Sequence, residues 1–227
     1  TLSLVAHELR TPLTAIKLSL DLSLRRLQRR IPLDPSAFTV ALTSCLQLER
    51  MVTDLVDASR ADNKQMALSL ALCDGRELAA QAISEQQATT DREITLETTA
   101  APAPILADAA RIRQVLSNLI SNAIKYSPPE TRVTLRVETR EGSALFGVRD
   151  EGLGVRPDAI PHLFEAFYRA PDVVSLTGPN VGLGLGLYLC KRIVDLHGGQ
   201  IGMRNRPEGG SLFWFSIPLA QAPVAGE

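Results

Sequence analysis

The first 62 residues carry two apolar stripes separated by a proline-rich break, a pattern that admits few folds. In residues 2–27, apolar side chains recur at spacings of three and four, and a second stripe of the same kind covers residues 41–59. The break at residues 31–35 holds two prolines, which lack the amide hydrogen that a helix interior needs. The pattern predicts an antiparallel helical hairpin. Because one hairpin cannot bury both stripes, we expect two chains to pair as a four-helix bundle.

The chain from about residue 63 onward predicts an α/β sandwich, so that the whole chain is of the α+β class. Helical and strand-like periodicities alternate in this part, and helices on one face of a mixed sheet would bury both. We expect helices at residues 75–88, 109–126 and 187–197, a stub around Ile105, and strands at residues 93–98, 132–139, 144–150, 200–205 and 211–219. We place the domain boundary between residues 62 and 63.

Composition narrows the classes of function. The chain is 45% hydrophobic and has a formal net charge of −1, which argues against nucleic acid as a partner. Its three cysteines lie far apart without metal-ligand spacing, and we expect buried thiols in a reducing compartment. No apolar run is long enough to span a membrane. We therefore expect a soluble, cytoplasmic fragment of a longer protein that reaches a membrane only through upstream segments, if at all.

A histidine block at residues 7–13 reads His-Glu-Leu-Arg-Thr-Pro-Leu. His7 comes one residue after the apolar stripe position Ala6, so on a helix it lies on the exposed flank of that stripe. A neutral imidazole nitrogen is a good nucleophile, and the carboxylate of Glu8 can hold the proton of the other ring nitrogen. Pro12 would bend the helix beside the histidine. Taken alone, the block fits an ordinary surface histidine equally well.

The expected helix at residues 109–126 has a polar face beside its apolar stripe. Asn118, Asn122 and Lys125 stand at positions i, i+4 and i+7 and therefore line up on that face. Carboxamide oxygens can coordinate Mg²⁺, and a lysine can neutralise a phosphate oxygen. A solvated polar face is the alternative interpretation.

Two glycine-containing turns follow. Asp150 ends an expected strand, where a buried acid needs a donor such as the amino group of adenine, and Gly152 and Gly154 would let the backbone turn close to the base. An ordinary turn aspartate is the alternative. Residues 182–187 read Gly-Leu-Gly-Leu-Gly-Leu and open a helix, whose N-terminus favours phosphate. A Walker loop is excluded because no Gly-Lys-Ser/Thr follows.

The four blocks, in this order and at these separations, resemble the catalytic core of bacterial sensor histidine kinases over nearly the whole chain. The resemblance implies that residues 1–62 form a dimerisation and histidine phosphotransfer domain and residues 63–227 a catalytic ATP-binding domain. It implies two-component signal transduction by a homodimer, joined through the hairpin. In such a dimer His7 is autophosphorylated from ATP, with Mg²⁺, and passes the phosphoryl group to an aspartate in the receiver domain of a response regulator.

The resemblance also implies a role for each matching residue. His7 would be the phosphoacceptor, Glu8 the general base, and Thr11 the residue that positions water when phosphate is removed from the partner. Asn122 would bind Mg²⁺ with support from Asn118. Asp150 would read adenine. The other residues of the nucleotide site would be Lys125, Tyr126, Gly152, Gly154, Gly182, Gly184, Leu185, Gly186 and Leu187, beneath a lid at about residues 169–181.

The sequence departs from the family's pattern in two places. Leu183 occupies a position that is more often small or hydroxyl-bearing, and the lid is unusually apolar. These departures favour one alternative, a non-catalytic or phosphatase-dominant nucleotide-binding dimer scaffold of the same fold. An ATPase of the related gyrase and chaperone type is disfavoured, because the water-activating glutamate of that group is replaced here by Asn118, which cannot act as a base.

Overall fold

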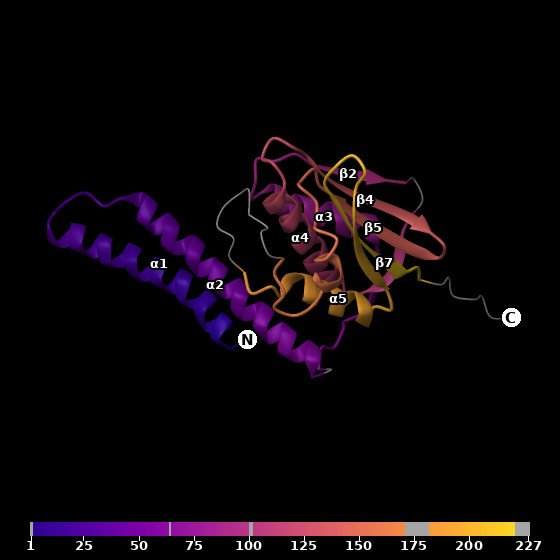
Figure 1. Ribbon diagram of the computed structural model, residues 1–227, viewed down its shortest axis with the longest axis horizontal. Coiled ribbons are helices and arrows are strands. Elements are labelled where there is room, and N and C mark those ends of the chain that lie inside the picture. The colour runs from indigo at the N-terminus through magenta and orange to yellow at the C-terminus, as the bar shows by residue number, and fades with distance from the viewer. Residues whose placement is uncertain (1, 64, 100–101, 171–181, 221–227) are drawn as a thin grey trace.

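The computed structural model describes residues 2–63, 65–99, 102–170 and 182–220 (Figure 1). A long helical hairpin extends from one side of an α/β sandwich, and the turn of the hairpin is the part farthest from the sandwich (Figure 1). The α+β class expected from the sequence is therefore confirmed. Among the described residues, no helix is both long and apolar enough to cross a membrane.

The hairpin consists of α1 (Leu2–Gln28) and α2 (Pro35–Asp62). Asp34 caps α2, since its side chain accepts a hydrogen bond from the Ser36 amide, and Pro35 starts the helix at a position where its missing amide hydrogen costs nothing. Within one chain, much of the apolar surface of both helices is uncovered. The exposed large apolar residues are Leu13, Leu18, Leu20, Leu22, Leu24, Leu27, Phe38, Val40, Leu42, Leu46, Val52 and Val56.

The sandwich has one five-stranded sheet in the order β2-β4-β5-β7-β6. β2 pairs parallel to β4, and all other neighbours are antiparallel. The strands are β2 (Ile94–Thr98), β4 (Val133–Arg140), β5 (Ser143–Arg149), β6 (Gln200–Asn205) and β7 (Ser211–Pro218). The helices α3 (Gly75–Gln87), α4 (Ala109–Tyr126) and α5 (Gly186–Leu196) lie on one face of this sheet (Figure 1).

Three small elements complete the sandwich. β1 (Ala71–Asp74) and β3 (Pro104–Ala107) form a separate antiparallel pair, and a short 3₁₀ helix covers Ile160–His162. The stub expected around Ile105 is β3. β1 was not expected, because its four residues show no apolar alternation that would mark a strand.

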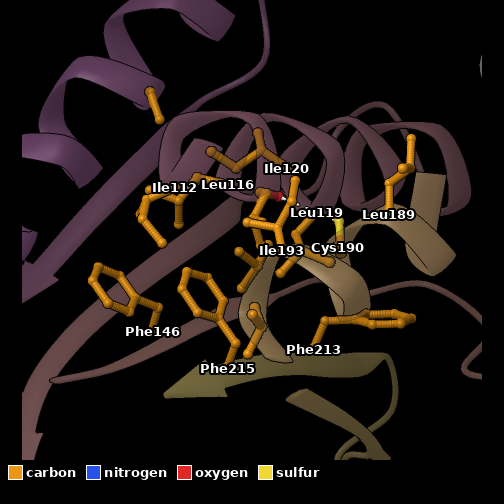
Figure 2. Close-up of a cluster of buried hydrophobic side chains, with 14 of the residues drawn as sticks. Ile112, Leu116, Leu119, Ile120, Phe146, Leu189, Cys190, Ile193, Phe213 and Phe215 are labelled. Atoms are coloured by element: carbon orange, nitrogen blue, oxygen red, sulfur yellow. Dashed lines mark hydrogen bonds between the residues drawn. The ribbon is translucent and has the colours of Figure 1, made fainter. Parts of the chain in front are cut away.

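The core lies between the sheet and the helices α4 and α5. Phe146 of β5 and Phe215 of β7 stack with ring centroids 4.6 Å apart, and Leu116, Leu119 and Ile193 pack above them (Figure 2). All five side chains are fully buried. Because the apolar stripe of α4 faces this core, the polar face of the same helix is turned toward the loops described below.

The cysteines differ from expectation in one case. Cys190 is buried, and burial raises the pKa of its thiol to about 12, so it stays neutral. Cys73 is half-buried. The prediction of a buried Cys45 is wrong, because this residue lies on a surface of α2 that the rest of the same chain does not cover.

Candidate functional site

The polar face of α4 forms one wall of the candidate site. Asp108 caps the helix through hydrogen bonds from the amides of Ala110 and Arg111. Asn118, Asn122 and Lys125 are all half-buried on this helix. The Nδ2 atom of Asn118 is buried and has no hydrogen-bond partner among the described residues. Its electrostatic neighbour is the buried Cys190 thiol, and because a buried amide donor favours an oxygen acceptor, an oxygen-bearing ligand would satisfy it better.

The Asp150 loop forms a second wall. Asp150 is 4% exposed, and its Oδ1 accepts hydrogen bonds from the backbone amides of Gly152 (2.8 Å) and Ser211 (3.1 Å). Burial raises the pKa of this carboxyl, and the hydrogen bonds from the two amides oppose the rise. The loop is pressed against the end of α4, because a Cβ added at Gly152 would collide with the carbonyl oxygen of Tyr126. Tyr126, Asp150 and Gly152, which were each expected at the nucleotide site, are therefore neighbours in the structure.

Two other glycines of these turns are required by the backbone conformation. Gly154 has a φ of +75° and Gly184 a φ of +69°, in the left-handed region that side chains disfavour. The Phe167 amide donates to the Gly184 carbonyl (3.0 Å), and a Cβ on Gly184 would stand 2.7 Å from the Tyr168 carbonyl oxygen. The chain on both sides of the expected lid is thus held together. Residues 171–181, which make up most of that lid, lie outside the described residues.

The glycine-rich turn leads into α5, and its leucines have a structural role. Leu183 and Leu185 are 3% and 1% exposed, so their side chains belong to the core. Leu187 is half-buried and packs against the same core. Only backbone groups of Leu185 can face a ligand, and no described side chain caps the N-terminus of α5 there. Gly186 and Asn118 are neighbours, since a Cβ on Gly186 would lie 3.8 Å from the Asn118 Nδ2 atom. These contacts bring the turn onto the polar face of α4.

The histidine block lies on α1, where His7 is exposed. Glu8 is turned toward the sandwich, and its carboxylate accepts hydrogen bonds from Arg169 Nη1 (3.2 Å) and from the Gly182 amide (3.3 Å). Its side chain is 13% exposed. Among the described residues, no hydrogen bond joins Glu8 to the His7 ring. The Thr11 hydroxyl donates weakly to the His7 carbonyl (3.4 Å) and remains exposed.

Arg169 is a residue of the site to which sequence reasoning gave no role. It follows the aromatic residues Phe167 and Tyr168 and begins the expected lid. The only feature of the sequence that could have marked it as a site residue is its positive charge at the edge of an apolar lid. The structure brings it to a carboxylate 161 residues away. The two flanks of the lid thereby meet the helix that carries His7.

A second set of contacts holds the sandwich against α2. Arg111 of α4 makes a two-pronged ion pair with the buried Asp57, with Nη1–Oδ2 at 2.6 Å and Nη2–Oδ1 at 3.2 Å. From α5, Tyr188 hydrogen-bonds Asp62, and Arg192 donates to the Ala61 carbonyl (2.9 Å). The sequence offered no signal for these pairs, because their members are distant along the chain.

Two protein families match the two parts of the chain. Residues 107–221 match the sequence model of the family described as "Histidine kinase-, DNA gyrase B-, and HSP90-like ATPase", and residues 1–64 match that of the "His Kinase A (phospho-acceptor) domain". The chain is 32% identical over 207 residues to the sensor histidine kinase YkoH of Bacillus subtilis, which covers 91% of this chain and 44% of the relative. It is 30% identical over 235 residues to the adaptive-response sensory kinase SasA of Synechococcus elongatus, which covers 96% and 58%. The chain thus spans about half the length of these curated relatives.

Solved structures show the same architecture. The histidine kinase AdeS of Acinetobacter baumannii superimposes with a TM-score of 0.69 at 26% identity, over 95% of this chain and 98% of that one. Full-length ShkA in complex with AMPPNP superimposes with a TM-score of 0.68 at 28% identity, over 94% and 47%. Fold and site together define an ATPase-type sandwich docked on a hairpin that bears a histidine. The chain belongs to the two-component histidine kinases and forms a catalytic core of that family.

Proposed function

We propose that this chain is an ATP-dependent protein-histidine kinase core that phosphorylates its own His7 and passes the phosphoryl group to an aspartate in a response regulator. The observation that carries the proposal is the contact of Glu8 with Arg169 and Gly182. It joins the edge of the nucleotide-site loops to the residue next to the expected phosphoacceptor.

The residues present fit ATP and Mg²⁺. The unpartnered Asn118 amide, the buried Asp150 carboxyl and the uncapped start of α5 offer a donor, an acceptor and a set of backbone amides around one region. The carboxamide oxygen of Asn122 is the proposed Mg²⁺ ligand, with Asn118 in support, and Lys125 is the proposed phosphate contact. The Asp150 carboxyl would read the adenine amino group. Bound Mg²⁺-ATP supplies the phosphoryl group and leaves as ADP.

Glu8 and His7 would carry the proton chemistry. In the transfer step, one His7 ring nitrogen gives its electron pair to the new phosphorus–nitrogen bond, and Glu8 accepts the proton released by the other nitrogen. Glu8 accepts a hydrogen bond from Arg169 in this structure, so its carboxylate must first turn from Arg169 toward the imidazole ring of His7. The arrangement seen here is therefore a resting arrangement of the base. Thr11, one helical turn from His7, is the proposed residue that positions water to hydrolyse the aspartyl phosphate of the response regulator, which releases inorganic phosphate.

A homodimer through the hairpin and a receiver-domain partner are part of the proposal. The uncovered leucines of α1 and α2 form an apolar surface that water disfavours, and a second hairpin would bury it. The exposed helix surface around His7 would remain accessible to the receiver domain. The boundary between the dimerisation and ATP-binding domains is proposed at residues 62 and 63, where α2 ends.

Labelling with radioactive Mg²⁺-ATP tests the proposal. We expect acid-labile, alkali-stable label in the native chain and none in His7→Gln. The matched control is His162→Gln, because His162 is also an exposed histidine and its ring contacts only the nearby side chains of Glu165 and Tyr168 among the described residues. Equal label in all three proteins, or no label in a native chain that binds ATP, would overturn the kinase assignment.

A further inference from the structure

Arg92 is a buried arginine that the proposed mechanism does not use. It lies just before β2, the edge strand of the sheet (Figure 1), and is only 6% exposed. Burying a guanidinium is costly unless every donor is satisfied. No carboxylate among the described residues hydrogen-bonds it.

The Arg92 guanidinium instead binds the end of α4 and the turn that follows. Nη1 donates to the carbonyls of Ile124 (2.7 Å) and Ser127 (3.1 Å), and Nε donates to the carbonyl of Thr131 (3.1 Å). Nη2 donates to the Pro128 carbonyl (2.6 Å) and to the hydroxyls of Ser127 (2.8 Å) and Thr131 (2.7 Å). One planar fork thus fixes the last helical turn and the following turn as a unit.

The Arg92 guanidinium lies at the C-terminus of α4, where a positive charge stabilises a helix. The last carbonyls of a helix have no intrahelical partner and carry partial negative charge, so a cation there stabilises the terminus. Burial lowers the pKa of the Arg92 guanidinium, and the carboxylates of Asp150, Glu130 and Glu151 oppose that shift. The carboxylates of Asp150 and Glu151 therefore lie close enough to Arg92 to favour its charged form.

The unit that Arg92 binds lies within the candidate nucleotide site. Lys125 and Tyr126 belong to the last turn of α4, and Gly152 packs directly against the Tyr126 carbonyl. A shift of this turn would move the proposed phosphate contact and the loop that carries Asp150 together. Both walls of the site depend on where α4 ends.

We propose that Arg92 is a positioning residue for nucleotide binding, which holds the C-terminal turn of α4 so that Lys125 and the Asp150 loop face the same ligand. This inference rests on the proposed kinase function. Arg92 touches no reacting group and acts through the backbone that it clamps. It should therefore govern affinity for ATP rather than the rate of the transfer step.

The test compares Arg92→Lys, which keeps the charge but not the planar fork, with Thr131→Val. The second variant removes the hydroxyl that accepts one Arg92 hydrogen bond and donates one to the Pro128 carbonyl. Ile217→Val, in the buried part of β7 and away from these contacts, is the control for lost stability. We measure the rate of His7 labelling against Mg²⁺-ATP concentration, the dissociation constant of Mg²⁺-ADP by calorimetry, and the melting temperature.

We expect Arg92→Lys to raise KM for ATP and the dissociation constant for ADP about tenfold, the equivalent of one charged hydrogen bond, with kcat changed less than about twofold. Thr131→Val should give a smaller rise in both constants, and Ile217→Val should change neither.

A lower melting temperature without a change in KM or in the dissociation constant would overturn the inference and leave Arg92 a purely structural residue. A fall in kcat at constant KM would overturn it too. If the native chain shows no label on His7, the kinase function fails, while the ADP affinities still decide the role of Arg92.

Discussion

The ion pair between Asp57 of α2 and Arg111 of α4 should anchor the sandwich on the hairpin, and the cost of removing it can be estimated. The Asp57 side chain is 6% exposed and that of Arg111 is 24% exposed. Breaking a fully buried pair costs about 3–5 kcal/mol, and the partial exposure of Arg111 reduces this to about 2 kcal/mol. We expect Asp57→Asn to lower the free energy of unfolding by about this amount, and to slow His7 labelling because the sandwich is held less firmly.

A double-mutant cycle in urea measures the pair itself. Asp57→Asn and Arg111→Met, singly and together, should give a coupling free energy of at least about 1 kcal/mol. The control is the ion pair of Arg140 with Glu141, whose side chains are 70% and 81% exposed. The same cycle there should give less than about 0.5 kcal/mol. Equal coupling free energies for the two pairs would refute the reasoning from burial.

Three further predictions follow from single features of the structure. Burial raises the pKa of Asp54 to about 6, so the folded chain loses stability as pH rises through 4 to 6. Urea unfolding of Asp54→Asn should show a free energy of unfolding about 1–2 kcal/mol higher than that of the native chain at pH 8. Near pH 4 the two free energies should be almost equal. Gly152→Ala should weaken ADP binding at least about tenfold in calorimetry, since the new Cβ displaces the loop from Tyr126; unchanged affinity would contradict the assigned packing. Because Glu8 contacts Arg169 of its own chain, mixed dimers of His7→Gln and Asn122→Ala should stay unlabelled, and recovered label would show transfer between chains.

The helices were the most predictable elements. α4 has the bounds that its pattern predicts, because an amphipathic pattern sustained over 18 residues and the capping Asp108 are both local signals. β1 escaped prediction because four residues carry too little pattern. The burial of Cys45 was predicted wrongly, since the period that defines a stripe does not say whether the same chain or another covers it.

The candidate site was less completely predictable from the sequence than the helices were. The blocks around His7, Asn122, Asp150 and the glycine-rich turn could be read from the sequence, and the structure brings the last three to adjoining positions. Their roles in binding and catalysis remain predictions. The proposed contact of Leu185 with the ligand is narrowed to its backbone, because its side chain is buried in the core. Leu187 is half-buried, and its proposed contact stays a prediction.

The sequence by itself determined the long helices, the strands of the five-stranded sheet and the chemical character of each block, because these depend on residue spacing along a regular backbone. Only the tertiary structure decided the polar pairings: Arg92 with the end of α4, Arg111 with Asp57, and Arg169 with Glu8. These partners are 32, 54 and 161 residues apart. A guanidinium accepts many arrangements of oxygen atoms, so its partner is chosen by which groups the packed core brings within hydrogen-bond distance and shields from water.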